Sequence, residues 1–121
     1  MTLILDTSLV LELFRYKRLD LIELKQLSSG KILVPSAVAH ELVRLGKGPV
    51  LEYLLKGGCK QLPGEAHYAD REIGKLIESS GEVLVVGTQD FALVRKLKSF
   101  KGKFRHLFLR GKRKLVISGG N

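Results

Sequence analysis

The sequence has 121 residues, 45% hydrophobic and 27% charged, which predicts a single folded domain with its own core and excludes an intrinsically disordered chain. Its one cysteine, Cys59, excludes an intramolecular disulfide framework, and the lack of a signal peptide or a long apolar run favours a cytoplasmic protein that does not enter a membrane. Lys and Arg number 21 against 12 Asp and Glu, a formal net charge of +9, which favours a polyanionic partner such as nucleic acid.

Apolar runs and helical periodicities alternate along the chain. Residues 2–5 form a continuous apolar run that predicts a first strand. The next helix is expected to be capped by Thr7 or Ser8 and to turn Leu9, Val10, Leu13 and Phe14 inward. The further elements expected are a helix over 20–27, a strand over 32–34, helices over 35–45 and 50–56, a minor strand over 59–62, a long helix over 66–79, a strand over 83–86, a helix over 89–99 and two edge strands over 104–109 and 114–117. This order predicts an α/β fold with a central, mainly parallel sheet covered by helices on both faces.

Two acidic residues lie inside the apolar stripes of expected helices. Glu41 shares the face of Ala37 and is expected to point toward the sheet, unless it is a boundary residue paired with Arg44. Asp70 precedes Ile73 on the buried face of the helix expected over 66–79, in a helix interior that Asp disfavours. The other acids of that helix, which are Glu65, Glu72 and Glu78, are expected on or near its solvated side. The two inward acids therefore favour a functional role.

Two more acids follow strands. Asp6 closes the first strand, and Asp90 follows the strand over 83–86 after a short link. Each can be an ordinary residue at a helix N-terminus, but the carboxyl ends of parallel strands are where open α/β sheets bind ligands. Neighbouring hydroxyl groups on Thr7, Ser8 and Thr88 can orient carboxylates or waters. Four converging carboxylates in a basic protein indicate a site for a hard divalent metal and phosphodiester chemistry.

Four segments in this order resemble the PIN domain. They are Leu3–Ser8, Val34–Leu42, Tyr68–Ile73 and Val85–Asp90. Because their order, their spacing and the chain length all match, the resemblance extends over essentially the whole chain. The basic segment Leu107–Leu115 resembles the archaeal branch near the small-subunit processome PIN endonucleases more than VapC-type toxins. The resemblance implies one PIN domain over residues 1–121 with a Rossmann-like three-layer α/β/α fold.

The same resemblance implies a metal-dependent ribonuclease site. It places Mg²⁺ or Mn²⁺ on Asp6, Glu41, Asp70 and Asp90. PIN sequences often have Asn at the position of Gln89, and many carry a further acid where this chain has the apolar residues 91–93. These departures predict weaker metal binding or activity than in the best-equipped members.

The implied function is hydrolysis of RNA phosphodiester bonds, in ribosomal-RNA processing or as the toxin of a toxin–antitoxin pair. The alternative is a catalytically weak PIN domain that binds RNA or serves as a scaffold. The partners implied are single-stranded or structured RNA, an antitoxin or a ribosome-assembly protein, and a second copy in a homodimer. Cations expected to contact RNA are Arg15, Lys17, Arg18, Arg71, Arg110, Lys112, Arg113 and Lys114.

Other classes of site fit the sequence less well. The first strand is followed by neither the acidic pair of a receiver domain nor the glycine-rich turn of a dinucleotide-binding domain. His40, His67 and His106 are scattered without metal-ligand spacing, which argues against a zinc site. Many Lys and Arg beside few Asn, Gln, Cys and Met indicate a thermophilic source.

Overall fold

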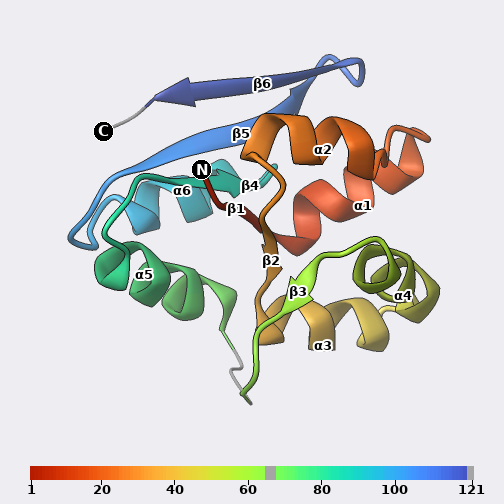
Figure 1. Cartoon of the computed structure of the whole chain (residues 1–121), viewed down its shortest axis with the longest axis horizontal. Helices are drawn as coiled ribbons and strands as arrows, with labels where there is room; N and C mark the ends of the chain where they lie inside the picture. Colours follow the sequence, from red (N-terminus) through yellow and green to blue (C-terminus); the bar gives the residue numbers. More distant parts are fainter. Residues whose placement is uncertain (65–67, 120–121) are drawn as a thin grey trace.

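A six-stranded sheet forms the centre of the molecule in the computed structural model, which describes residues 1–64 and 68–119 (Figure 1). The strands are β1 (Leu3–Leu5), β2 (Ile32–Val34), β3 (Lys60–Gln61), β4 (Leu84–Gly87), β5 (Phe104–Arg110) and β6 (Lys114–Gly119). Their spatial order is β3-β2-β1-β4-β5-β6, and each neighbouring pair is parallel except β5 and β6. The expected mainly parallel sheet is confirmed.

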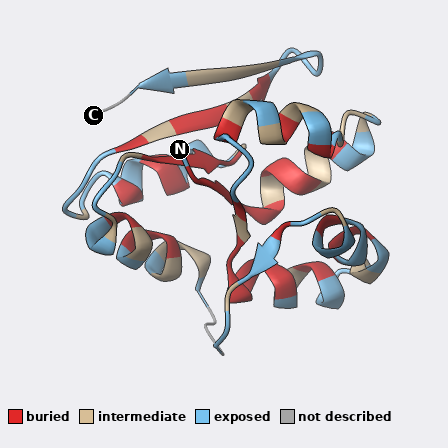
Figure 2. Ribbon diagram, viewed as in Figure 1, coloured by how far each residue is buried: buried red, intermediate tan, exposed pale blue. Residues whose placement is uncertain are grey.

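Helices cover both faces of the sheet, which gives three layers. The helices are α1 (Thr7–Arg15), α2 (Leu21–Ser28), α3 (Ser36–Arg44), α4 (Gly48–Lys56), α5 (Ala69–Ser79) and α6 (Phe91–Leu97). Side chains alternate along β1, so that Leu3 and Leu5 pack with α1 to α4 while Ile4 packs with α5 and α6. Figure 2 shows the buried residues concentrated on the strands and on the helix faces turned toward them.

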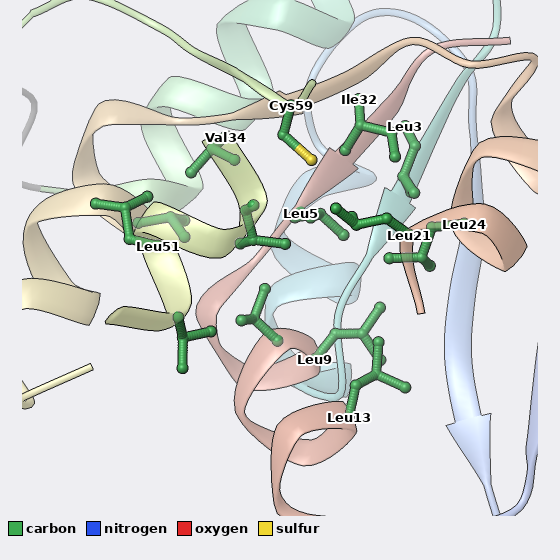
Figure 3. Close-up of a cluster of buried hydrophobic side chains, with 14 of the residues drawn as sticks. Leu3, Leu5, Leu9, Leu13, Leu21, Leu24, Ile32, Val34, Leu51 and Cys59 are labelled. Carbon is green, nitrogen blue, oxygen red and sulfur yellow. The ribbon is translucent and has the colours of Figure 1, made fainter. Parts of the chain in front are cut away.

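The larger of the two hydrophobic clusters lies between the sheet and α1 to α4 (Figure 3). Cys59 is part of it, and burial raises the pKa of its thiol, although the nearby Lys25 acts in the opposite direction. The thiol therefore stays protonated and packs as a small apolar group. Of the helices in the described ranges, none is long and apolar enough to cross a membrane.

Several helix starts differ from the expectation because side chains outside the helices satisfy their first N–H groups. Asp6, not Thr7 or Ser8, is the N-cap of α1, and Asp90 is the N-cap of α6, which begins two residues later than expected. Helix α5 begins at Ala69; the residues at 66–67, where its start was expected, lie outside the described ranges.

Two expectations about exposure and edges were wrong. Phe14 is 47% exposed, although it was expected on the inner face of α1. Strand β5 is not an edge strand, because it pairs with β4 on one side and β6 on the other. Strands β5 and β6 form a hairpin that extends the parallel sheet by one antiparallel strand, and β6 lies at that edge.

The strand order reverses between β1 and β4, and backbone contacts hold the ends of these two strands together. The backbone N–H of Asp6 donates to the carbonyl of Gly87 at 2.8 Å, which continues the pairing beyond β1. A Cβ at Gly87 would lie 2.7 Å from Leu9 Cδ2, so the missing side chain lets α1 approach the end of β4. In open α/β sheets, ligands bind at such a switch point.

Candidate metal centre

A pocket of about 490 Å³ opens at the carboxyl ends of β1 and β4. Its lining comes from both strand ends and from α1, α3, α5 and α6, and consists of Asp6, Thr7, Ser8, Leu11, Glu41, Leu45, Tyr68, Ala69, Asp70, Asp90, Ala92, Leu93 and Lys96. All four acids singled out from the sequence therefore lie on one pocket, although they come from four different segments of the chain. We call this the acidic pocket.

Asp6 is held by the hydroxyl groups beside it. Its Oδ2 accepts hydrogen bonds from Ser8 Oγ at 2.6 Å and from Thr88 Oγ1 at 2.7 Å. Each hydroxyl has one proton. When both protons are donated to Asp6, the 2.9 Å contact between the two hydroxyl oxygens is not itself a hydrogen bond. Asp6 Oδ1 has no hydrogen-bond partner within residues 1–64 and 68–119. One oxygen thus fixes the carboxylate and the other is free to bind a ligand.

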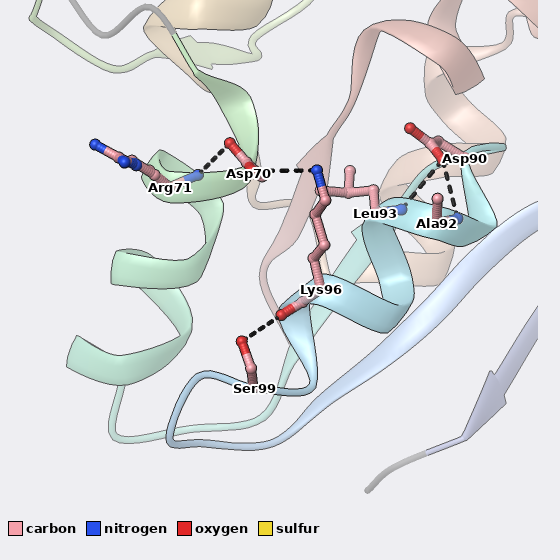
Figure 4. A network of polar contacts seen from close by, with 7 residues as sticks. All are labelled: Asp70, Arg71, Asp90, Ala92, Leu93, Lys96 and Ser99. Carbon is pink, nitrogen blue, oxygen red and sulfur yellow. Dashed lines mark hydrogen bonds and ion pairs between the residues drawn. The ribbon is translucent and has the colours of Figure 1, made fainter.

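Thr88 also connects Asp6 to Asp90. Its Oγ1 accepts from the backbone N–H of Asp90 at 3.0 Å, while Asp90 Oδ1 accepts from the N–H groups of Ala92 and Leu93 at 3.0 and 3.1 Å (Figure 4). Ser8 Oγ accepts from the N–H of Gln89 at 2.9 Å. Of the three residues expected to orient carboxylates or waters, Ser8 and Thr88 hydrogen-bond to Asp6, whereas Thr7 Oγ1 has no partner among the described residues.

Asp70 lies in the first turn of α5 and not in a helix interior. There its charge complements the helix dipole, and its Oδ1 accepts from the N–H of Arg71 at 2.9 Å. Its Oδ2 faces the ammonium group of Lys96, which reaches across from α6 to a distance of 3.9 Å (Figure 4). The local cost inferred from the sequence is therefore wrong, and Asp70 has a structural benefit as well.

Glu41 is more exposed than the helical pattern indicated. Its side chain is 43% exposed and its Oε2 lies 3.8 Å from Arg44, the pairing that the sequence left open as an alternative. It nevertheless lines the acidic pocket. A pair this exposed contributes little to stability and leaves the carboxylate available to a stronger cation.

The donor set fits a hard divalent cation that keeps part of its water shell. Within the described ranges no three carboxylates lie close enough together to enclose a metal ion directly, but Mg²⁺ binds through one or two carboxylates and several waters. Thr7 Oγ1 is buried on this pocket and has no partner among the described residues, so it can hydrogen-bond a metal-bound water. These residues fit a hydrated Mg²⁺ or Mn²⁺.

Sequence reasoning missed the role of Glu72. Its carboxylate accepts from Ser36 N at 2.9 Å, Ser36 Oγ at 2.8 Å and Ala37 N at 3.0 Å. It therefore caps α3 from outside, where Pro35 at the N-cap offers no side-chain bond, and it is not the solvated residue expected. The only sequence signal was an α3 start without a capping side chain, which does not say which residue supplies the cap.

Gln89 and His106 hold the loop between β4 and α6. The Gln89 side chain pairs with the backbone of Leu109, donating to its carbonyl at 3.0 Å and accepting from its N–H at 2.6 Å. His106 Nε2 lies 2.7 Å from the carbonyl oxygen of Thr88. Both contacts position Thr88 and Asp90 and take no place on the acidic pocket.

The cations expected on RNA do not form one cluster. Lys112 at the hairpin tip and Arg15 both place their charge 5.3 Å from the ring of Tyr16, which brings the hairpin to the C-terminal end of α1. Arg71 lies apart on α5, over the ring of Tyr68, and Arg18 is paired with Glu23 at 3.6 Å. The remaining members of the set, Lys17, Arg110, Arg113 and Lys114, are exposed.

Comparison with known proteins identifies the fold. No protein-family model and no curated protein sequence matches the chain. Its structure is similar to that of the PIN domain endonuclease Utp24, with a TM-score of 0.75 and 22% sequence identity over 97% of this chain and 90% of that one. The chain therefore has the PIN-domain fold, a three-layer α/β/α arrangement around a mainly parallel sheet.

Proposed function

We propose that residues 1–121 form a single PIN domain that acts as a metal-dependent endoribonuclease. The observation that carries the proposal is the acidic pocket, in which Asp6, Glu41, Asp70 and Asp90 share one hollow at the switch point of the sheet. Likeness to an endonuclease of the same fold supports it, and so does a net charge of +9, which attracts a polyanionic substrate.

The protein's own residues would hold and orient the reacting groups. Asp6, Asp70 and Asp90 would hold Mg²⁺ or Mn²⁺ directly or through water, and Glu41, which lines the same pocket, would contribute a fourth carboxylate. A bound ion of this kind lowers the pKa of water and neutralises charge on a phosphate. Thr7 Oγ1 would hydrogen-bond a water, and the hydroxyls of Ser8 and Thr88 would keep Asp6 in one orientation.

One observation favours a second candidate, an RNA-binding PIN domain with little catalysis. Lys96 lies at Asp70 and Arg44 at Glu41, so two of the four carboxylates already have a cation near them. In that case the acidic pocket would support little or no cleavage, and RNA would be bound through the exposed lysine and arginine side chains. The two candidates differ in the effect of a metal ion. In the first, the metal makes the protein cleave RNA; in the second, it changes at most the affinity of the protein for RNA.

A cleavage assay on a labelled single-stranded RNA decides between them. We expect cuts with Mn²⁺ or Mg²⁺, none with a strong chelator, and a loss of orders of magnitude in Asp6→Asn. The exposed Glu78→Gln is the matched control and should cleave like the unmodified chain. Cleavage that survives the chelator would contradict the metal mechanism, and binding without cleavage would favour the second candidate. Growth arrest on expression that Asp6→Asn relieves would indicate a toxin, and its absence would favour RNA processing.

A further inference from the structure

A second hollow, of about 440 Å³, lies between the C-terminal end of α1 and the start of α4. It is lined by Phe14, Lys17, Leu19, Pro49, Val50 and Tyr53. We call it the aromatic groove, because Phe14 and Tyr53 each expose 47% of their surface. Single exposed apolar residues are ordinary, but two aromatic rings in one hollow indicate a binding surface.

The charge of the aromatic groove is opposite to that of the acidic pocket. Lys17 is its one charged lining residue among those described, and neither Asp nor Glu lines it. The ammonium group of Lys47 lies 5.2 Å from the centre of the Phe14 ring. Next to it, Arg15 and Lys112 both lie over Tyr16. Aromatic rings interleaved with cations are typical of surfaces that bind single-stranded nucleic acid.

The two hollows are connected by shared elements. Thr7 and Leu11 of α1 line the acidic pocket, and Phe14, three residues further along the same helix face, lines the aromatic groove. From Thr7 to Phe14 the helix rises about 10 Å. On the other side, Leu45 lines the pocket and Pro49 lines the groove. A chain bound at the acids can therefore continue along α1 into the groove.

We propose that the aromatic groove binds a base of the single-stranded RNA that occupies the acidic pocket. The inference rests on the proposed function and adds a subsite to it. A nucleotide offers a flat π surface for Phe14 and Tyr53 and a phosphate for Lys17 and Lys47, and stacking of this kind tolerates any base. Lysines lie at the groove, and neither Asp nor Glu is among its described lining residues. This favours RNA, a polyanion, over a protein segment as the occupant.

The test compares a labelled oligouridine with an abasic oligomer of the same length by fluorescence anisotropy, in chelator to prevent cleavage. Phe14→Leu keeps an apolar side chain but removes the ring face. We expect it to weaken binding of the oligouridine by about 5- to 150-fold, the range of one stacked base, and to leave binding of the abasic oligomer unchanged. Ile22→Ala, which removes an exposed apolar side chain from α2, is the control and should change neither.

A second readout is independent of affinity. The chain contains no Trp, so Tyr53→Trp introduces a single reporter whose emission stacked bases should quench and abasic oligomers should not. Equal affinities of Phe14→Leu and the unmodified chain for oligouridine, with no quenching, would overturn the inference and indicate that the groove seats a protein segment instead. If the unmodified chain binds neither oligomer in chelator and neither binds nor cleaves the oligouridine with Mn²⁺ present, the proposed function itself fails.

Discussion

Thr88 gives the most direct test of how the acidic pocket is built. Its hydroxyl donates to Asp6 Oδ2 at 2.7 Å, accepts from the N–H of Asp90 at 3.0 Å and is fully buried. Thr88→Val keeps the shape of the side chain but leaves the carboxylate with one donor fewer and the N–H without its acceptor. Each loss of this type costs about 1–3 kcal/mol, so we expect the free energy of unfolding to fall by about 2–6 kcal/mol.

The chain offers a matched control at the other end of the sheet. Thr2 is also buried, and its hydroxyl donates to Glu82 Oε1 at 3.0 Å, but it accepts no hydrogen bond in the described ranges. Thr2→Val removes one bond to a carboxylate and should cost about 1–3 kcal/mol. The difference in the free energy of unfolding between the two variants measures the contribution of the hydrogen bond from Asp90 N–H to Thr88 and of the deeper burial of Thr88.

Urea unfolding without metal measures both losses, and Mn²⁺ titration calorimetry measures the consequence for the pocket. We expect Thr88→Val to bind Mn²⁺ more weakly than the unmodified chain, because Asp6 and Asp90 lose their common anchor, whereas Thr2→Val should bind it normally. Equal losses of stability in the two variants would refute the argument that one hydroxyl holds both acids.

Two further predictions concern residues that contact the acids or support the pocket. Lys96→Met should lower the dissociation constant for Mn²⁺ by about 2- to 10-fold, because a positive charge 3.9 Å from Asp70 opposes a second cation there; exposed Lys98→Met is the control, and an unchanged constant would show that Lys96 does not compete. Glu72→Ala should lower the free energy of unfolding by about 1–3 kcal/mol, because two N–H groups at the start of α3 lose their acceptor. Glu78→Ala on the same helix should change it little, and equal effects in chemical denaturation would contradict the capping role.

Local patterns in the sequence predicted the layers and the meeting of the four acids. Apolar runs located β1, β2 and β4, and the rule that parallel strands end at one edge brought Asp6 and Asp90 together. Helical periodicity placed Glu41 on the pocket side of α3 even though its side chain is half exposed. These inferences depend on spacing within one segment, which the chain shows directly.

Contacts between distant segments were not predictable in the same way. Glu72 was expected in solvent because its place on α5 was read without α3, whose first N–H groups it accepts from. The pattern of α6 alone does not indicate a role for Lys96, because its partner Asp70 lies on another helix. Because α5 begins at Ala69, Asp70 lies in its first turn and not in the helix interior that a helix over 66–79 implies.

The structure also changes what the acids imply about stability without metal. Repulsion among four carboxylates alone would strain the fold, but Asp6 and Asp90 cap α1 and α6, and Asp70 lies in the first turn of α5. Each of these carboxylates has one oxygen bonded to backbone N–H groups at a helix start, where negative charge is favoured. The same residue can therefore stabilise its helix through one oxygen and offer the other to a cation. Because Asn caps a helix about as well as Asp, Asp90→Asn removes the charge and keeps the cap, whereas Asp90→Ala removes both. If Asp90 both caps α6 and binds metal, both variants should bind metal more weakly, and only Asp90→Ala should lose stability.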